Sequence, residues 1–328
     1  MAKAENSILN PFGYVDLGIG DWADGVKQWA IANRESMQPI RETVNDLIVT
    51  IESAFQATPQ VVMLAILTLL AWQTAGRKVA WIVFGCLVAL GLLDPRAWGL
   101  AMTTMAIVGA SVIICVIIGL PMGVLAGKSD RFYATIRPIL DLMQTIPAFV
   151  YLVPVVMLIG IGNVSGVIVT VVFALPPLIR LTSLGIRQVN QSVVEAARAF
   201  GASPSQTLLK VELPLSLPSI MTGVNQTIMM ALSVVVIASL ISVKGLGNEV
   251  LRAMGRLDAG KAIVGGLGIV ILAIVLDRIS QGLGQSDRER GHRHWWQQGP
   301  IGLIVSLLNK ESKENSTPSS IGTDYESS

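Results

Sequence analysis

The chain has 328 residues, of which 52% are hydrophobic and 14% are charged, so it carries less charge than a typical soluble domain. This composition predicts an integral membrane protein, and a net charge of only +2 argues against a basic nucleic-acid-binding surface. Cys86 and Cys115 both lie in apolar runs. We interpret them as small buried hydrophobic residues, and expect neither a disulfide framework nor a metal cluster.

The N-terminal tail, residues 1–57, is expected to be extracytoplasmic and to contain amphipathic helices. Apolar residues recur at helical spacing over 40–55 with polar residues between them, and a shorter helix is predicted over 22–29 after Asp21 as its N-cap. Such helices either lie in the membrane interface or pack on a partner subunit, and the sequence leaves both alternatives open.

Seven apolar segments follow, and a bilayer core about 30 Å thick needs about 20 apolar residues of helix to cross it. They cover residues 58–75, 79–93, 100–127, 139–160, 164–184, 218–242 and 261–282. The first two are short and meet at 76–78, so they form either a tight hairpin of two spans or an interfacial element. We assign 58–97 to an accessory transmembrane hairpin. The last five predict a helical core over 98–282, giving an all-α fold of about seven transmembrane helices.

The orientation of these spans is predicted from lysine and arginine in the short loops, which favour the cytoplasmic side. The basic residues that fall on one side are Arg77, Lys78, Lys128, Arg131, Arg137, Arg187, Arg198, Lys210, Arg278, Arg288, Arg290 and Arg293. The N-terminus is therefore expected outside and the C-terminus in the cytoplasm. Residues 283–308 form a basic and aromatic cytoplasmic segment with an interfacial anchor at 294–296, and the Ser-rich tail, 309–328, is expected to be disordered.

Few groups that could perform chemistry are present in the spans. The stretch Gly123 to Ser129 resembles a phosphate-binding loop, but its glycine spacing is wrong and it ends an apolar span, so we reject nucleotide binding there. Gly119, Gly123 and Gly127 instead have the spacing that lets membrane helices approach closely. The scarcity of intramembrane carboxylates indicates that any transport energy comes from elsewhere.

Several spans contain proline, which removes a backbone hydrogen bond and bends a helix. These prolines are Pro121, Pro147, Pro154, Pro176 and Pro177. Kinked helices can line a cavity, but proline kinks also occur without function. Pro147, Phe149 and Tyr151 are candidates for a translocation path, although helix packing explains the two aromatic residues equally well.

The polar stretch from Glu195 to Pro214 lies between spans and predicts two short helices outside the bilayer. Ser192 and Glu195 have the spacing of a capping box, and Gly201 suits a left-handed position after the first helix. Ser203 and Gln206 form a second capping box, and this second helix is expected to end near Val211, before Pro214. Residues 184–217 hold three basic and two acidic side chains, too few cations for a DNA-binding helix-turn-helix.

This stretch resembles the cytoplasmic signature of bacterial ATP-binding-cassette importer permeases. The matching residues are Glu195, Ala196, Ala197, Gly201, Val211, Leu213 and Pro214, with valine at 211 where the family often has isoleucine. The segments GDWADGVKQW in the N-terminal tail, LDLMQTIPAFVYLVP from Leu140, and GRLDAGKAIVGGLGIVILAIVLDR from Gly255 are similar to the glycine betaine/proline permease subfamily. Together they cover most of residues 16–300.

The resemblance implies a five-helix importer core over 98–282, with cytoplasmic coupling helices over 189–214 that dock on a separate ATPase. It implies that ATP and Mg²⁺ bind on that partner, so the chain binds no cofactor or metal of its own and is not an enzyme. Further implied partners are a second, identical permease copy and an external substrate-binding protein delivering an osmoprotectant of the glycine betaine or proline betaine type. The expected location is the bacterial inner membrane.

Two alternatives stay open at this point. The chain could be an importer permease for a different small solute. It could also be an ATP-independent carrier or channel, which the kinked, glycine-rich spans favour and the polar helix pair disfavours.

Overall fold

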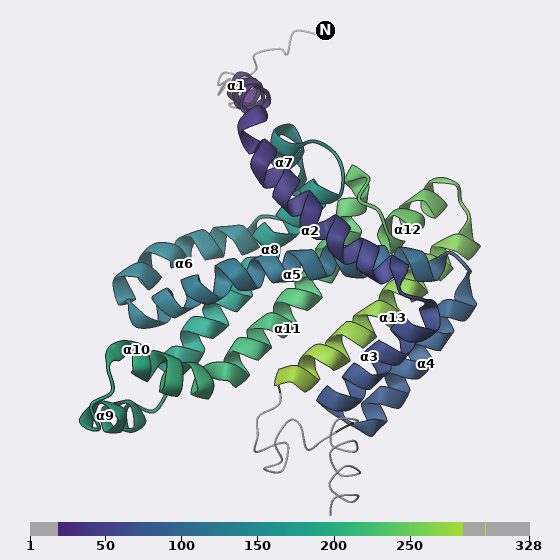
Figure 1. Ribbon diagram of the computed structural model, residues 1–328. Helices are drawn as coiled ribbons and strands as arrows, with labels where there is room; N and C mark the ends of the chain where they lie inside the picture. Colours follow the sequence, from purple (N-terminus) through teal and green to yellow (C-terminus); the bar gives the residue numbers. More distant parts are fainter. Residues whose placement is uncertain (1–18, 285–298, 300–328) are drawn as a thin grey trace, which may run out of the picture.

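The computed structural model describes residues 19–284 and Gly299, and its described part is helical without strands (Figure 1). The first elements are α1 (Ile19–Ala32), η2 (Glu35–Met37), α2 (Gln38–Ala57), α3 (Gln60–Ala75), α4 (Arg77–Leu93), α5 (Ala97–Lys128), α6 (Asp130–Thr145), η3 (Ala148–Tyr151) and α7 (Leu152–Ile159). They are followed by α8 (Asn163–Arg187), α9 (Gln191–Ala199), α10 (Pro204–Thr207), η4 (Leu208–Glu212), α11 (Leu213–Ile237), η5 (Ala238–Ile241), α12 (Leu246–Gly255) and α13 (Ala259–Gly284).

Several helices are suited to a membrane, which confirms the predicted class of fold. By length and hydropathy, four described stretches could each cross a bilayer, over 97–128, 163–187, 204–241 and 259–283. The count rises to six if each of two bent helix pairs is taken as one span. The predicted number of about seven is therefore not confirmed, and the orientation of the termini stays a prediction.

The segment predicted as one span over 139–160 is not one continuous helix, although its length and composition still allow the bent pair to count as a single broken span. The chain leaves α6 at Thr145 and bends by 100° before η3 and α7. Pro147 has φ −56° and ψ 137°, an extended conformation that ends a helix, and residue Ile146 before it is extended too. A residue preceding proline is disfavoured in the helical region because its backbone collides with the proline ring, which explains the position of the break.

The centre of the bundle is the contact between α5 and α8. Gly119, Gly123 and Gly127 lie one turn apart on α5, and a Cβ atom built on them would meet three side chains of α8. These side chains are Leu178, Thr182 and Ile186. The clearest case is Gly123, whose added Cβ would lie 2.5 Å from Cβ of Thr182. The small-residue spacing thus does what the sequence predicts, and it brings two long helices into close contact.

Two groups of helices pack around this pair. In Figure 1, α6 and α11 run beside α5 and α8, and α3, α4 and α13 form a second group with α12 at one end. The first two predicted spans form α3 and α4, which pack against each other and turn sharply at Gly76, where φ is +87°. Only glycine adopts this backbone conformation without strain, so the hairpin turn is explained by the residue present.

The amphipathic helix predicted over 40–55 is confirmed as α2. Val44 and Ile48 are buried, and α2 lies across the end of the bundle against α5, where the Thr103 hydroxyl donates to Glu52 at 2.7 Å (Figure 1). The apolar face is therefore covered by this chain itself. The predicted N-cap at Asp21 is wrong, because α1 already begins at Ile19 and Asp21 lies in its first turn.

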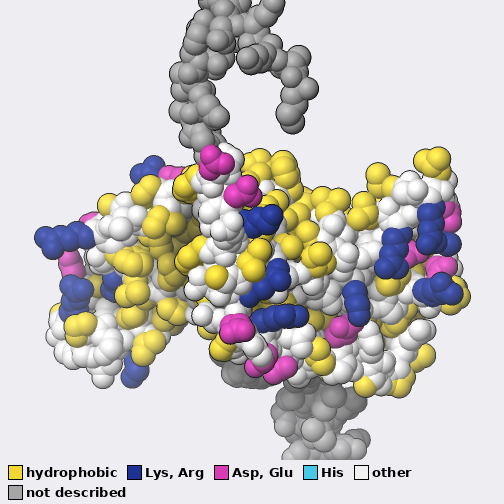
Figure 2. All heavy atoms as spheres, turned by 90° about the horizontal axis from the view of Figure 1, so that it is seen from above, with side chains coloured by type: hydrophobic (Ala, Val, Ile, Leu, Met, Phe, Trp, Pro, Cys, Tyr) yellow, Lys and Arg dark blue, Asp and Glu magenta, His cyan; other side chains and the backbone are white. Residues whose placement is uncertain are grey.

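Charged side chains gather at separate places on the side of the molecule that carries α1 and α2. Figure 2 shows this side, with acidic and basic side chains over its middle and at its left and right ends and hydrophobic side chains between them. The predicted aromatic anchor at 294–296 and the Ser-rich tail over 309–328 lie outside the described residues.

Candidate functional site

The polar stretch forms an arm, residues 190–212, at the end of the bundle away from α1 and α2 (Figure 1). Its first helix, α9, is capped differently from the prediction. The side-chain oxygen of Asn190 accepts from the backbone N–H of Ser192 at 3.0 Å, so Asn190 is the N-cap and the predicted capping box of Ser192 with Glu195 is wrong. Asparagine and serine are both good N-caps, and spacing alone does not choose between them.

The end of α9 confirms the predicted role of Gly201. Gly201 has φ +83°, its N–H donates to the carbonyl of Arg198 at 2.9 Å, and the N–H of Ala202 donates to the carbonyl of Ala197 at 3.0 Å. These two bonds define a Schellman motif, in which glycine takes the left-handed position without a steric cost. The chain therefore reverses sharply here, which sets the angle between α9 and the next helix.

The second half of the arm begins as predicted and continues further than predicted. Ser203 and Gln206 form a complete capping box at the start of α10. The helix does not end near Val211. It passes through a π-helical turn, Leu208–Glu212, directly into α11, so that Pro214 lies in the first turn of α11. A wider turn before Pro214 is the expected accommodation, because proline has no N–H and its ring clashes with the preceding turn.

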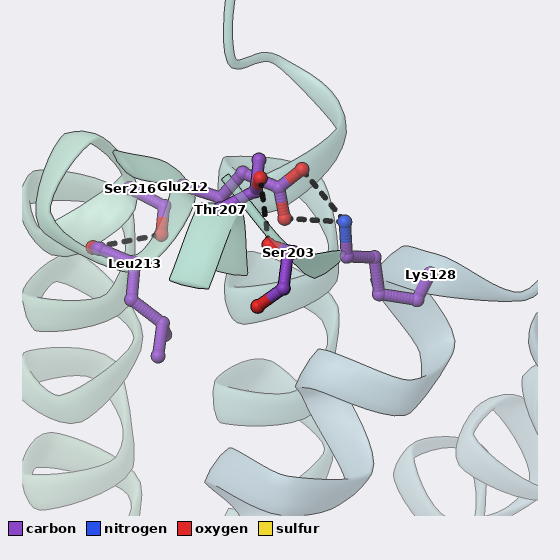
Figure 3. Close-up of polar contacts among 6 residues, drawn as sticks. All are labelled: Lys128, Ser203, Thr207, Glu212, Leu213 and Ser216. Carbon is purple, nitrogen blue, oxygen red and sulfur yellow. Dashed lines mark hydrogen bonds and ion pairs between the residues drawn. The ribbon is translucent and has the colours of Figure 1, made fainter. Parts of the chain in front are cut away.

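A buried ion pair fixes the base of the arm. The Lys128 ammonium, at the end of α5, lies 2.6 Å from Oε1 of Glu212 and also contacts Oε2 (Figure 3). Only 6% of the Glu212 side chain is exposed, against 36% for Lys128. Thr207 donates its hydroxyl to the carbonyl of Ser203 at 3.0 Å beside this pair. In the sequence, Lys128 served only to orient the spans, and its pairing with Glu212 was not predicted, although Glu212 lies between two signature positions and Lys128 ends an apolar span.

The signature residues are distributed between the surface and the base of the arm. Glu195, Ala196 and Gly201 are exposed on α9 and its turn, and Ala197 is half-buried. Val211 and Leu213 are half-buried at the π-helical turn, and Pro214 is exposed. The most exposed large apolar side chain of the arm is Phe200, at 93%, directly before the Gly201 turn. A solvent-exposed phenylalanine beside small alanines is a surface suited to contact with another protein.

The three candidate path residues lie at the break after α6. Pro147 begins the turn, and Phe149 is 57% exposed on η3. Tyr151 is half-buried, and its hydroxyl lies 3.4 Å from the carbonyl of Leu142 and 3.3 Å from that of Met143. Tyr151 therefore donates to carbonyl groups in the last turn of α6 and has a structural role at the break.

No group of three or more histidine, cysteine or acidic side chains that could hold a metal occurs among the described residues. The helical bundle, its long apolar helices and the exposed arm define a multi-pass membrane protein of the permease class.

Comparison with known proteins identifies the family. The family model described as binding-protein-dependent transport system inner membrane component matches residues 119–286, and the chain belongs to this family. It is therefore a multi-pass protein of the inner membrane and a transport permease.

Named relatives cover nearly the whole chain. The glycine betaine/proline betaine transport system permease protein ProW of Escherichia coli (strain K12) is 49% identical over 91% of this chain and 84% of the relative. The protein of the same name from Salmonella typhimurium is 50% identical over the same shares. The glycine betaine transport system permease protein OpuAB of Bacillus subtilis (strain 168) is 44% identical over 71% of this chain and 82% of the relative.

Proposed function

We propose that the chain is the membrane-spanning subunit of an ATP-driven importer for osmoprotectants of the glycine betaine or proline betaine type. The observation that carries this proposal is the likeness to permeases named for these solutes, at 49% and 50% identity over 91% of the chain. Identity at this level over both the arm and the spans supports a shared solute class as well as a shared fold.

The arm is the surface at which a separate ATPase subunit docks. Two features support this role. The helix α9 and the turn after it project from the bundle and expose Glu195, Ala196 and Phe200, and the second half of the arm continues into α11 as one helix over 204–241. The ATPase holds ATP and Mg²⁺, so this chain binds neither and is not itself an enzyme. Its coupling residues are Glu195, Ala196, Ala197, Gly201, Val211, Leu213 and Pro214.

We infer the remaining parts of the importer, with support from the family's description as a binding-protein-dependent transport system. A binding protein outside the cell delivers the solute to the end of the bundle that carries α2, and a second copy of the permease completes the path. ATP-driven closure of the ATPase pair moves the arms and switches access from outside to inside, a rigid-body change of packed helices. The break at Pro147, with Phe149 and Tyr151, lies along this path.

The first experiment is affinity purification of the chain from its own membrane in mild detergent, with ATPase activity measured on the eluate. A co-purifying nucleotide-binding subunit with vanadate-sensitive hydrolysis is the expected result. Recovery of this chain alone, inactive towards ATP yet able to carry solute into liposomes, would refute the proposal in favour of an ATP-independent carrier.

A variant tests the arm directly. Gly201→Pro cannot adopt the φ of +83° that the turn requires, so it should abolish uptake while the protein still inserts into the membrane. Full uptake by this variant would contradict the assigned role of the arm.

A further inference from the structure

Two ion pairs join α6 to α8 at different depths of the bundle. Arg187 lies 2.6 Å from Asp130 at the start of α6, and Arg180 lies 2.5 Å from Asp141 further along. Arg180 precedes Arg187 by seven residues, or about 10 Å of helix, and Asp141 follows Asp130 by eleven residues, or about 16 Å. The second pair is therefore well inside the bundle from the arm end.

The deeper pair, Arg180 with Asp141, is not buried by the rest of the chain. The side chains of Arg180 and Asp141 are 36% and 52% exposed. Charged groups at membrane depth are costly in contact with lipid, so they face the bundle interior or a water-filled cavity. Because α8 has the length and hydropathy of a membrane span, an exposed ion pair on its side indicates a face turned to water and not to lipid.

Arg137, Asp141 and Arg180 form a cluster that carries a net positive charge. Asp141 is shared between Arg180 and the more distant Arg137, whose Nε lies 4.0 Å away. No other carboxylate among the described residues forms an ion pair with either arginine. Two guanidinium groups around one carboxylate leave one positive charge in excess, and a guanidinium is well suited to bind a second carboxylate.

An exposed aromatic ring comes from the neighbouring element. Asp141 lies four residues before the end of α6, and the chain then breaks and forms η3, which packs against α8 and carries Phe149. The Phe149 side chain is 57% exposed. An aromatic face attracts a quaternary ammonium group through its π-electrons. An ion pair and an exposed aromatic ring thus occur on elements that pack on the same helix, with α6 and η3 both against α8.

We propose that Arg180, with Asp141 and Phe149, forms a solute station inside the translocation path. Arg180 binds the carboxylate of a zwitterionic solute, and Phe149 accepts its quaternary ammonium group. Asp141 holds the Arg180 side chain in position while the station is empty. This inference rests on the proposed function and adds to it the residues that select the solute.

The test measures binding without the external binding protein, which would otherwise dominate the affinity. The complete permease–ATPase complex is reconstituted in nanodiscs, and binding of glycine betaine and of choline is measured by equilibrium dialysis. Choline has the same ammonium group without the carboxylate. Solute uptake by the unaltered complex, and its ATPase activity stimulated by the external binding protein, are measured in parallel. If both are absent, the proposed function itself fails, independently of the proposed residues.

Three variants give distinct expected results. Arg180→Gln should weaken glycine betaine binding about tenfold or more through loss of a charge-assisted hydrogen bond, and leave choline binding unchanged. Phe149→Leu, at an exposed position, should weaken the binding of glycine betaine and of choline, and the factor should be similar for the two solutes. Arg187→Gln removes the other α6–α8 ion pair, and should leave the Kd of both solutes unchanged.

Several outcomes would overturn the proposal. One is an unaltered Kd for glycine betaine in Arg180→Gln. Another is equal weakening by Arg180→Gln and Arg187→Gln, which would show that both pairs only hold α6 in place. Absence of saturable binding to an unaltered complex that still takes up solute would place the solute station elsewhere.

Discussion

The ion pair between Lys128 and Glu212 allows a prediction in which the two partners behave unequally. Glu212 is nearly inaccessible, and its carboxylate has no ion-pair partner other than Lys128 among the described residues. Lys128 is one-third exposed and can turn its ammonium group towards water. Lys128→Met should therefore be the more harmful change, because it leaves a buried charge unpaired.

The size of the effect follows from burial. An uncompensated buried charge costs about 3 kcal/mol or more, whereas Glu212→Gln loses one charge-assisted hydrogen bond, worth about 1.5–3 kcal/mol. In a chain of this size these losses lower the melting midpoint on the order of 5 °C for Lys128→Met and less for Glu212→Gln. The double variant removes both charges and should be more stable than Lys128→Met alone.

The assay is fluorescence-detected size exclusion of detergent-solubilised protein after heating to a series of temperatures. Lys261→Met is the matched control, because it breaks the exposed pair with Asp258 and should change the midpoint by a value within error. Equal midpoints for Lys128→Met and Lys261→Met would refute the reasoning. So would a double variant whose loss equals the sum of the two single losses.

Three further predictions concern single side chains. Gly123→Val should cost about 1–3 kcal/mol and lower the heating midpoint, because its Cβ collides with Thr182, whereas Gly85→Val on α4 has open space and should behave as wild type. Gly201→Ala should retain membrane insertion but lose about 1–2 kcal/mol at the turn, seen as faster proteolysis of the arm. Tyr151→Phe should lower the midpoint slightly through loss of about 1 kcal/mol of hydrogen bonding, with a normal elution profile; an unchanged midpoint would show that water replaces the hydroxyl.

Local chemistry explains which parts of the fold are predictable from the sequence. The turn at Gly201 is predictable because a left-handed backbone position strongly favours glycine. The capping box of Ser203 with Gln206 is predictable because both of its hydrogen bonds join residues three positions apart. The N-cap of α9 was misplaced because Asn190 and Ser192 are both good caps and only the path of the chain decides between them.

Other features depend on contacts that are distant in the sequence. The break inside the span predicted over 139–160 was not expected because apolar composition does not report a bend, although Pro147 marks where it occurs. The pairing of Lys128 with Glu212 joins residues 84 positions apart, and no local pattern relates them. The pairing of Arg180 with Asp141 was missed for the same reason, since Asp141 alone looks like a residue near the end of a span.

The continuous helix from Pro204 to Ile241 has a mechanical consequence. Glu212, tied to Lys128, lies about 12 Å from the start of this helix and about 44 Å from its far end. If the helix tilts as a rigid body about Glu212, its two ends move in proportion to their distances from that residue. A displacement of about 1 Å at the Pro204 end then becomes roughly 3 to 4 Å at Ile241. A small movement of the arm is thereby amplified at η5, at the opposite end of the bundle.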